Sequence, residues 1–276
     1  MLRSCVLFGL LLSTWWGSVE AQSIDLPPRP LTSADASVII EEVAELSFQD
    51  RERRLVEEVL AGNVPSFLRD FVEIEMRVLV DGLERVVLIR VLPDVLSVGS
   101  SDDFFRVPLS PGAAQFIADR TNTSLPTPKI SDAIWSASAL RLVPQPIPPS
   151  EAMTTIPVFR DHHWLIESLW PDGLSHGTLV SGIKKDVVLS PLLEREAGRV
   201  AIYGWHQQDG SPIQPLYIGH DSGWVDYSHG IRLISRRVLV DGVENDLRDV
   251  LEHPAMWPLV SEEGVMRDGR YPTATR

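Results

Sequence analysis

The sequence FVEIEMRVLVDGLERVVLIRVL, from Phe71 to Leu92, decides the fold class of this chain. Apolar residues recur at every second position from Val72 to Val80, the period of a strand with one buried face. Asp81-Gly82 then supplies the two positions with positive φ that a tight hairpin turn requires, and a second strand follows from Leu83 to Val91. The segment therefore predicts a β-hairpin.

Helical signals lie on both sides of this hairpin. Before it, apolar residues at helical spacing from Ile39 to Leu60 predict two short helices or one broken helix. After it, Ser110-Pro111 and Ser131-Asp132 are typical helix starts. Residues 150–170 predict a further helix that Pro157 breaks or kinks, and the tail after Arg267 lacks any pattern and is expected to be disordered.

The second half of the sequence is richer in strand signals. Residues 177–190 indicate strand, turn and strand, and further strand-like runs lie at 199–203, 216–218 and 231–240. The sequence shows no long alternation of strands and helices, which argues against a doubly wound parallel sheet. We therefore predict an α+β fold, in which a helical and β-hairpin N-terminal part precedes a mainly antiparallel C-terminal part.

The chain divides into three stretches. Residues 1–21 resemble a signal peptide, with a positive Arg3, an apolar run from Cys5 to Trp16 that is too short to span a bilayer, and a cleavage site before Gln22. A retained signal anchor is the alternative. The Pro-rich residues 144–149 separate an N-terminal region, 22–149, from a C-terminal region, 150–276. We expect a secreted or periplasmic protein with no stable membrane insertion after cleavage.

Composition excludes several classes of function. The net charge of −13 argues against a nucleic-acid partner and against docking to anionic lipid, since both need a basic surface. The single cysteine, Cys5, lies in the signal peptide, so the mature chain is free of cysteine. Disulfides, thiolate catalysis and cysteine-ligated metals are thereby excluded. Export without disulfides suits a bacterial periplasm or exterior.

Residues 200–234 carry the strongest functional signal. This stretch holds three of the seven histidines, two of the eight tryptophans and three of the four tyrosines, most of them beside glycine or aspartate. All seven histidines lie after residue 160. Histidine titrates near neutral pH and is the commonest metal ligand, so the C-terminal half is expected to carry the site.

Tyr227 to Leu233 reads Tyr-Ser-His-Gly-Ile-Arg-Leu. It resembles the Ser-His-Gly-Cys-Ile-Arg-Leu signature of L,D-transpeptidases, which cross-link bacterial peptidoglycan through a cysteine acyl-enzyme. Val200 to His206 is similar to the strand that brings the second histidine of that family to its site, and the likeness covers about 35 residues. Ile231 stands where the nucleophilic cysteine would be, so that reaction is excluded. The C-terminal half also resembles a group of uncharacterised secreted bacterial proteins with Lys-Lys-Asp-Val-Val and Asp-Tyr-Ser-His-Gly-Ile-Arg-Leu segments.

The residue types themselves indicate acid–base chemistry. Asp226, Ser228 and His229 are a carboxylate, a hydroxyl and a base, but in an extended strand the first two share a face that the third does not. Ser228 could instead pair with a histidine of a neighbouring strand, or the three residues could form a simple turn. The catalytic candidates are His206, His220, Asp226, Ser228, His229 and Arg232.

We further expect Val200–Tyr203 and Ile231–Ile234 to pair as antiparallel strands. That pairing would bring His206 and His229 to one end of the sheet, with Arg232 nearby to meet an anionic group. Three histidines with aspartates would also suit a catalytic zinc, but their spacing matches no compact motif. We therefore name no metal ligand, and the cofactor stays open.

Lys184 and Lys185, beside Asp186, suit the orientation of a substrate carboxylate or, if buried, the role of a base, and a solvated hairpin tip is the alternative. The substrate-binding candidates are Lys184, Lys185, Trp205, Tyr217, Trp224 and Tyr227. Together these residues predict a secreted hydrolase that acts on cell-envelope material through a His/Ser/Asp site. The alternatives are a non-catalytic module that binds a cell-wall polysaccharide or peptide, and a structural protein in which these residues are core.

Overall fold

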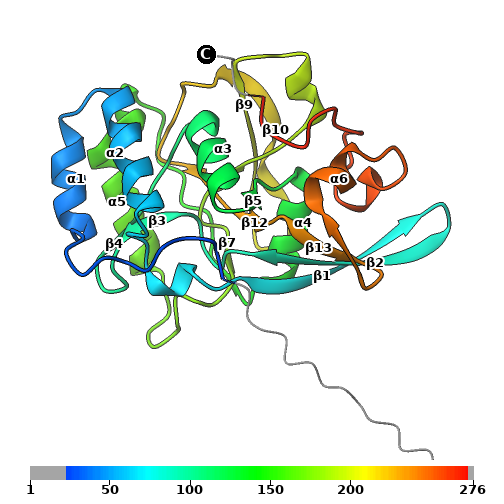
Figure 1. Cartoon of the computed structure of the whole chain (residues 1–276). Helices are drawn as coiled ribbons and strands as arrows, with labels where there is room; N and C mark the ends of the chain where they lie inside the picture. Colours follow the sequence, from blue (N-terminus) through cyan, green and yellow to red (C-terminus); the bar gives the residue numbers. More distant parts are fainter. Residues whose placement is uncertain (1–22, 273–276) are drawn as a thin grey trace, which may run out of the picture.

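The computed structural model describes residues 23–272, so the predicted signal peptide at 1–21 lies outside the described residues. The described part forms six α-helices and mostly antiparallel sheets, which confirms the predicted α+β class. Figure 1 shows α1, α2 and α5 gathered at one end of the molecule and the hairpin of β1 and β2 projecting at the other. No helix within residues 23–272 is long and apolar enough to cross a membrane.

The larger sheet joins strands from both halves of the sequence. Its order is β14-β13-β2-β12-β5, and β1 also pairs with β2. Buried apolar side chains from both sides of residue 149 belong to one core, so the predicted division does not separate two cores. The strands are β1 (Val72–Val80), β2 (Leu83–Val91), β5 (Thr123–Ser124), β12 (Ile234–Ser235), β13 (Arg237–Val240) and β14 (Val243–Asp246).

The hairpin predicted from Phe71 to Leu92 is confirmed. Val80 pairs with Leu83, and the turn residues Asp81 and Gly82 have φ values of 51° and 79°. Alternate residues of β1 are buried, as the two-residue period requires. A second Asp-Gly turn at residues 241–242 joins β13 to β14 with φ values of 50° and 81°.

Gly82→Val is expected to lower the free energy of unfolding by about 1–3 kcal/mol, because a β-branched residue is strained at positive φ. A side chain at residue 82 would meet no neighbouring atom within 4 Å, so backbone strain is the whole cause. Gly223 is equally open but has no positive φ, which makes Gly223→Val the matched control. Equal melting temperatures for the two variants would contradict the turn conformation.

The helices cover the core and begin at recognisable caps. Ser110 caps α3, whose first residue is Pro111, as predicted. Helix α4 begins at Pro128, because Thr127 accepts a hydrogen bond from the N–H of Ile130, and the predicted start at Ser131 is wrong. The α-helices are α1 (Ala36–Ala44), α2 (Phe48–Leu60), α3 (Pro111–Arg120), α4 (Pro128–Ala137), α5 (Ile156–Ser168) and α6 (Leu247–Glu252). The 3₁₀ helices are η1 (Ser66–Leu68), η2 (Glu151–Thr154), η3 (Pro191–Glu194) and η4 (Trp257–Leu259).

Pro157 does not break the helix of the C-terminal region. It lies in the first turn of α5, where a proline removes no intrahelical hydrogen bond. The preceding turn, η2, is separate. Helix α5 therefore runs unbroken to Ser168 and presents His162 and His163 to the interior.

The smaller sheet, in the order β10-β9-β8-β11, carries six of the twelve candidate site residues on its strands. Strand β11 is parallel to β8, and the other pairs are antiparallel. The predicted direct pairing of 200–203 with 231–234 is wrong, because β8 lies between β9 and β11 and residues 234–235 belong to the larger sheet. The strands are β8 (Lys185–Val187), β9 (Arg199–His206), β10 (Pro212–Asp221) and β11 (His229–Gly230).

Two strand pairs complete the fold. Strand β3 (Ser97–Gly99) pairs with β4 (Phe104–Arg106) in antiparallel fashion. Strand β6 (Leu140–Arg141) runs parallel to β7 (Val180–Ser181). The strand, turn and strand predicted within residues 177–190 are confirmed as β7, the bend at 182–184 and β8, but the two strands pair with different neighbours and do not form a hairpin.

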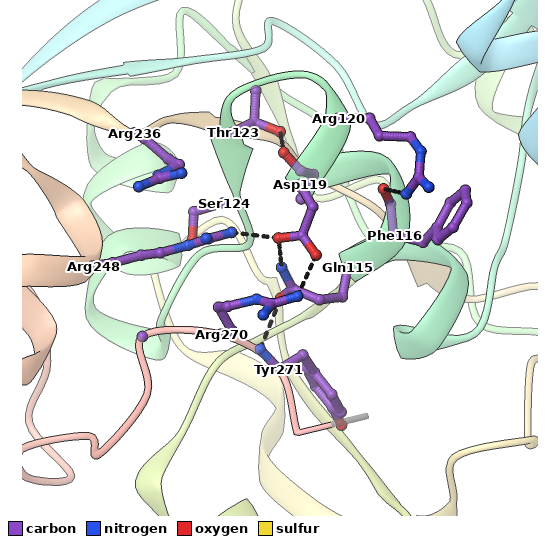
Figure 2. A network of polar contacts seen from close by, with 12 residues as sticks. Gln115, Phe116, Asp119, Arg120, Thr123, Ser124, Arg236, Arg248, Arg270 and Tyr271 are labelled. Atoms are coloured by element: carbon purple, nitrogen blue, oxygen red, sulfur yellow. Dashed lines mark hydrogen bonds and ion pairs between the residues drawn. The ribbon is translucent and has the colours of Figure 1, made fainter. Parts of the chain in front are cut away.

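The C-terminal residues up to 272 pack against the body of the protein, so disorder directly after Arg267 is wrong for them. Asp119 of α3 accepts hydrogen bonds from Arg248 and Arg270, and Gln115 accepts one from the backbone N–H of Tyr271 (Figure 2). The Tyr271 ring is 3% exposed, and its hydroxyl donates to the carbonyl of Arg199 at the start of β9. Residues 273–276 lie outside the described residues.

Candidate functional site

The register of the smaller sheet sets which side chains share a face. Lys185 of β8 is aligned with His229 of β11 on one side and with Gly204 of β9 on the other. Aligned residues point to the same face, so the side chains of Lys185 and His229 lie together. Asp186, the next residue of β8, points to the opposite face.

His229 is a buried imidazole without polar partners. Its side chain has no exposed surface, and neither ring nitrogen has a hydrogen-bond partner among residues 23–272. Its Nε2 lies 3.9 Å from Oδ2 of Asp226, beyond hydrogen-bonding distance. Burial lowers the pKa of His229 to about 4, against the opposing effect of Asp226. The imidazole is therefore neutral near pH 7, with both nitrogens unused.

Asp226 is fixed in place beside this imidazole. Its Oδ1 accepts hydrogen bonds from the backbone N–H of Ser228 at 2.7 Å and from the Ser228 hydroxyl at 2.5 Å. Its Oδ2 accepts one from Nε1 of Trp224 at 3.2 Å. Burial alone would raise the pKa of Asp226, but His229 and the hydrogen bonds from Ser228 bring it below its ordinary value. Asp226 is thus a fixed, ionised carboxylate.

Ser228 is not arranged as a nucleophile in this conformation. It is fully buried, and its hydroxyl donates to Asp226 and makes no hydrogen bond with an imidazole. Residues 226–229 form a turn, closed by a hydrogen bond from the N–H of His229 to the carbonyl of Asp226, so the simple turn expected as an alternative is observed and the alternation of an extended strand does not apply here. Of the predicted Asp/Ser/His set, only the aspartate approaches His229.

A row of rings continues from the carboxylate toward solvent. Trp224 stacks on His220 with ring centroids 5.0 Å apart, and His220 meets the edge of Tyr217 at 5.2 Å. Tyr217 is 43% exposed, and the other two rings are partly exposed. These contacts unite residues of β8, β10, β11 and the loop between β10 and β11. We call them the His229 cluster: Lys185, Tyr217, His220, Trp224, Asp226, Ser228 and His229.

Three of the predicted substrate-binding residues lie behind this cluster with buried side chains. Lys184 donates a hydrogen bond to the carbonyl of Tyr227 and another, of 2.9 Å, to Nδ1 of His162. Trp205 donates from Nε1 to the carbonyl of Gly182 at 2.9 Å. Lys184, Trp205 and Tyr227 are 4%, 2% and 3% exposed, so they hold the backbone of the site and offer no stacking surface.

The contact between Lys184 and His162 also fixes a tautomer. Burial and the neighbouring Lys184 lower the pKa of His162 to about 2, so the ring is neutral. Its Nε2 lies 3.1 Å from the carbonyl of Gln145 and must donate, which leaves Nδ1 to accept from the lysine. Burial, together with the nearby guanidinium of Arg106, lowers the pKa of Lys184 to about 7, against the opposing effects of the Asp226 and Asp94 carboxylates.

A break in β9 separates His206 from this site. Gly204 and Trp205 have φ values of 94° and 53°, and such a conformation is costly for a bulky residue. The break interrupts the alternation of faces along the strand. Trp205 consequently packs near Lys185, with Nζ 5.9 Å from its ring centre, while the next residue turns the other way.

His206 lies on the face opposite His229. Its Nε2 is 2.7 Å from Oδ1 of Asp132 in α4, and the same oxygen accepts from the Tyr203 hydroxyl at 2.8 Å. Tyr203 is aligned with Asp186, which marks this face of the sheet. The predicted approach of His206 to His229 is therefore wrong.

Arg232 does not face the site either. It is 2% exposed, and its guanidinium donates to the carbonyls of Leu92 at 3.0 Å and Val180 at 2.8 Å. The expectation that it meets an anionic group near His229 is wrong, because these contacts hold its guanidinium between the end of β2 and β7. Arg232 ties β2 and β7 to the chain beyond β11.

No protein-family model matches this sequence, and neither a curated protein nor a solved structure proved similar to it. The chemistry must therefore be argued from the residues alone. Within residues 23–272 no three His, Asp, Glu or Cys side chains are placed to hold a metal ion. The His229 cluster offers one neutral base, one ionised carboxylate and one ammonium, the groups that proton transfer at a polar bond requires.

A pocket of about 400 Å³ lies away from the cluster, between the Pro-rich segment and the turn that joins β9 to β10. None of its lining residues belongs to the His229 cluster. The residues are Val143, Pro144, Pro146, Gln207, Gln208, Asp209 and Ile213.

Several polar partners had no signal in the sequence. Asp132 stood out only as a helix start, yet it binds His206. His162 was one of two adjacent histidines without an evident role, yet it supports Lys184. Both partnerships join residues more than 20 positions apart, so only the fold could bring them together.

Proposed function

We propose that this protein is a secreted bacterial hydrolase that cleaves acyl bonds, amide or ester, in cell-envelope material, with His229 as general base. The observation that carries this proposal is the His229 imidazole, which is buried, neutral and without a hydrogen bond. Buried polar groups normally have partners, and strongly shifted pKa values concentrate at functional sites.

The neighbouring groups fit a water-activating base. In this reaction His229 takes a proton from water, the hydroxide adds to the acyl carbon, and the imidazolium returns the proton to the leaving nitrogen or oxygen. Asp226, 3.9 Å from Nε2, stabilises the imidazolium while it exists. Ser228 holds that carboxylate through two hydrogen bonds and so acts as a positioning residue.

The carboxylate content of the cluster favours acyl over glycosyl substrates. Most glycosidases use two carboxyl groups on either side of the scissile bond. The His229 cluster contains one, Asp226, and its two oxygens already accept three hydrogen bonds. A base with a supporting carboxylate suits hydrolysis at a carbonyl carbon better.

A non-catalytic module that binds a glycan or peptide is the second candidate. It is favoured by the buried, carboxylate-bound hydroxyl of Ser228 and by the exposed ring of Tyr217 beside Trp224. Incubation of the exported protein with purified peptidoglycan, followed by analysis of released amines and carboxylates, separates the two. Hydrolysis is expected; retention on the polymer without any product would favour the binding module.

The rate of hydrolysis is expected to fall on acidification with a midpoint near pH 4. Only the unprotonated imidazole accepts a proton from water, and the pKa of His229 is about 4 instead of the ordinary 6.5. The rate should therefore be constant from about pH 5.5 to 7 and fall below that range. Burial is the main cause of this low pKa; Asp226 opposes it, while Lys185, His220 and Lys184 lower the pKa further. A midpoint between pH 6 and 7 would assign the proton transfer to another group.

A further inference from the structure

Lys185 stands out among the three lysines of the chain because its ammonium has no hydrogen bond or ion pair among residues 23–272. Lys129 donates to the carbonyl of Pro258 at 2.7 Å, and Lys184 donates to His162 and Tyr227. Lys185 is partly buried, its Nζ lies 5.9 Å from the ring centre of Trp205, and the carboxylate of Asp226 attracts it without a direct ion pair. An ammonium that has lost part of its hydration normally gains an anion in return.

The unpaired ammonium and the unpaired imidazole are neighbours. Lys185 and His229 are aligned residues of adjacent strands, and aligned side chains on one face are about 4.5–5.5 Å apart at Cβ. Gly204, aligned with Lys185 on its other side, contributes no side chain. The carboxylate of Asp226 is already engaged by Trp224 and Ser228. The face therefore holds a partly exposed ammonium without a hydrogen bond beside a fully buried imidazole without one.

We infer that the His229 cluster recognises a free carboxylate on its substrate and that Lys185 binds this carboxylate. The substrate is then an N-acylated amino acid or peptide with a carboxylate close to the scissile acyl bond. This inference rests on the proposed function and names its substrate class. A single ammonium matches a monoanion; a phosphate group prefers several donors or an arginine fork. The one nearby arginine of this sequence stretch, Arg232, is occupied by backbone carbonyls.

The aromatic row suits the rest of such a substrate. Trp224 offers a partly exposed ring next to the carboxylate of Asp226, and Tyr217 offers another on the far side of His220; apolar or planar peptide groups pack on such rings. With its carboxylate on Lys185, the substrate places an acyl carbon beside His229, the neighbouring residue of the sheet. Lys185 is thereby a specificity-determining residue, and His229 supplies the chemistry.

The test is a binding titration followed by NMR with the whole exported chain and two probes, N-acetylglycylglycine and its C-terminal amide. Hydrogen bonds to a charged group contribute about 1.5–3 kcal/mol, so the wild type is expected to bind the acid at least about 10-fold more tightly than the amide. Lys185→Met should abolish that preference, and Lys185→Arg should keep most of it. Lys129→Met is the matched control and should behave as wild type.

Equal affinity for acid and amide in the wild type would overturn the inference, as would an acid preference that survives in Lys185→Met. Because the readout is binding, it is independent of turnover. A carboxylate preference without any hydrolysis of peptidoglycan would sustain this inference and defeat the proposed function. Hydrolysis of peptidoglycan without a carboxylate preference would support the proposed function and overturn this inference.

Discussion

Replacement of Lys184 by methionine is expected to flatten the dependence of stability on pH between about pH 7 and 9.5. In the folded protein burial lowers the pKa of Lys184 to about 7 from an ordinary value of 10.5. Between these values the unfolded chain binds more protons than the folded chain, so the free energy of unfolding rises with pH. The slope for one proton is about 1.4 kcal/mol per pH unit, or about 2–3 kcal/mol across this range.

The slope of the free energy of unfolding against pH, and not its value at any one pH, tests this prediction. Methionine also removes the hydrogen bond to the carbonyl of Tyr227, and a buried carbonyl left without a donor costs about 1–3 kcal/mol at every pH. Above about pH 10 the tyrosines intervene, since burial raises the pKa of Tyr203 and Tyr271 and the unfolded chain ionises first.

Urea unfolding at four pH values from 7 to 9.5 measures this slope. The wild type and the control Lys129→Met should both show the rise. A rise that is undiminished in Lys184→Met would mean that the ammonium of Lys184 is not the group responsible, and that its buried contacts with His162 and Tyr227 do not set its protonation.

Arg106→Met is expected to destabilise the protein by about 3–5 kcal/mol, the cost of leaving a buried charge without its partner. The side chains of Arg106 and Asp94 have no exposed surface, and the guanidinium donates to both oxygens of Asp94 at 2.7–3.1 Å. It also donates to Oε1 of Glu167 at 2.6 Å. The rings of Phe104 and Trp170 lie 5.2 and 5.6 Å from it.

A double variant identifies the cause. If the loss comes from the stranded carboxylate of Asp94, then Asp94→Asn combined with Arg106→Met should recover part of it, because an amide is far less costly to bury than a charge. Arg160 forms an exposed pair with Asp161, and Arg160→Met should lose much less. Similar unfolding midpoints in urea for Arg106→Met and Arg160→Met would contradict the role of the buried network.

Local features of the fold were predictable from the sequence, and long-range ones were not. The Asp-Gly pair at residues 81–82 favours the two positive φ angles of the turn, and apolar residues alternate with others along β1. The hairpin could therefore be predicted without tertiary information. The site stretch at 200–234 was also found from composition alone. Its geometry was not, because the break at Gly204 and Trp205 reverses the faces of β9. A glycine near the end of a strand permits such a break, but the positive φ of the neighbouring Trp205 has no signal in the sequence.

The two neighbouring lysines illustrate the same limit. Alternation places Lys184 and Lys185 on opposite sides of the chain, but it does not say which of them is buried. That depends on His162, which approaches from α5, and on His229, which approaches from β11. The pair of Arg106 and Asp94 had no sequence signal either, since single charges between apolar residues usually lie at the surface.

The general-base role is tested most directly by measuring two quantities for the His229→Met variant: its rate of hydrolysis and its free energy of unfolding. The imidazole makes no hydrogen bond that methionine would lose, so stability should change by no more than about 1 kcal/mol. The rate on peptidoglycan should fall by about 10²–10⁴-fold, the usual contribution of a general base. An unchanged rate together with a large loss of stability would show that His229 is a structural core residue and would contradict the account.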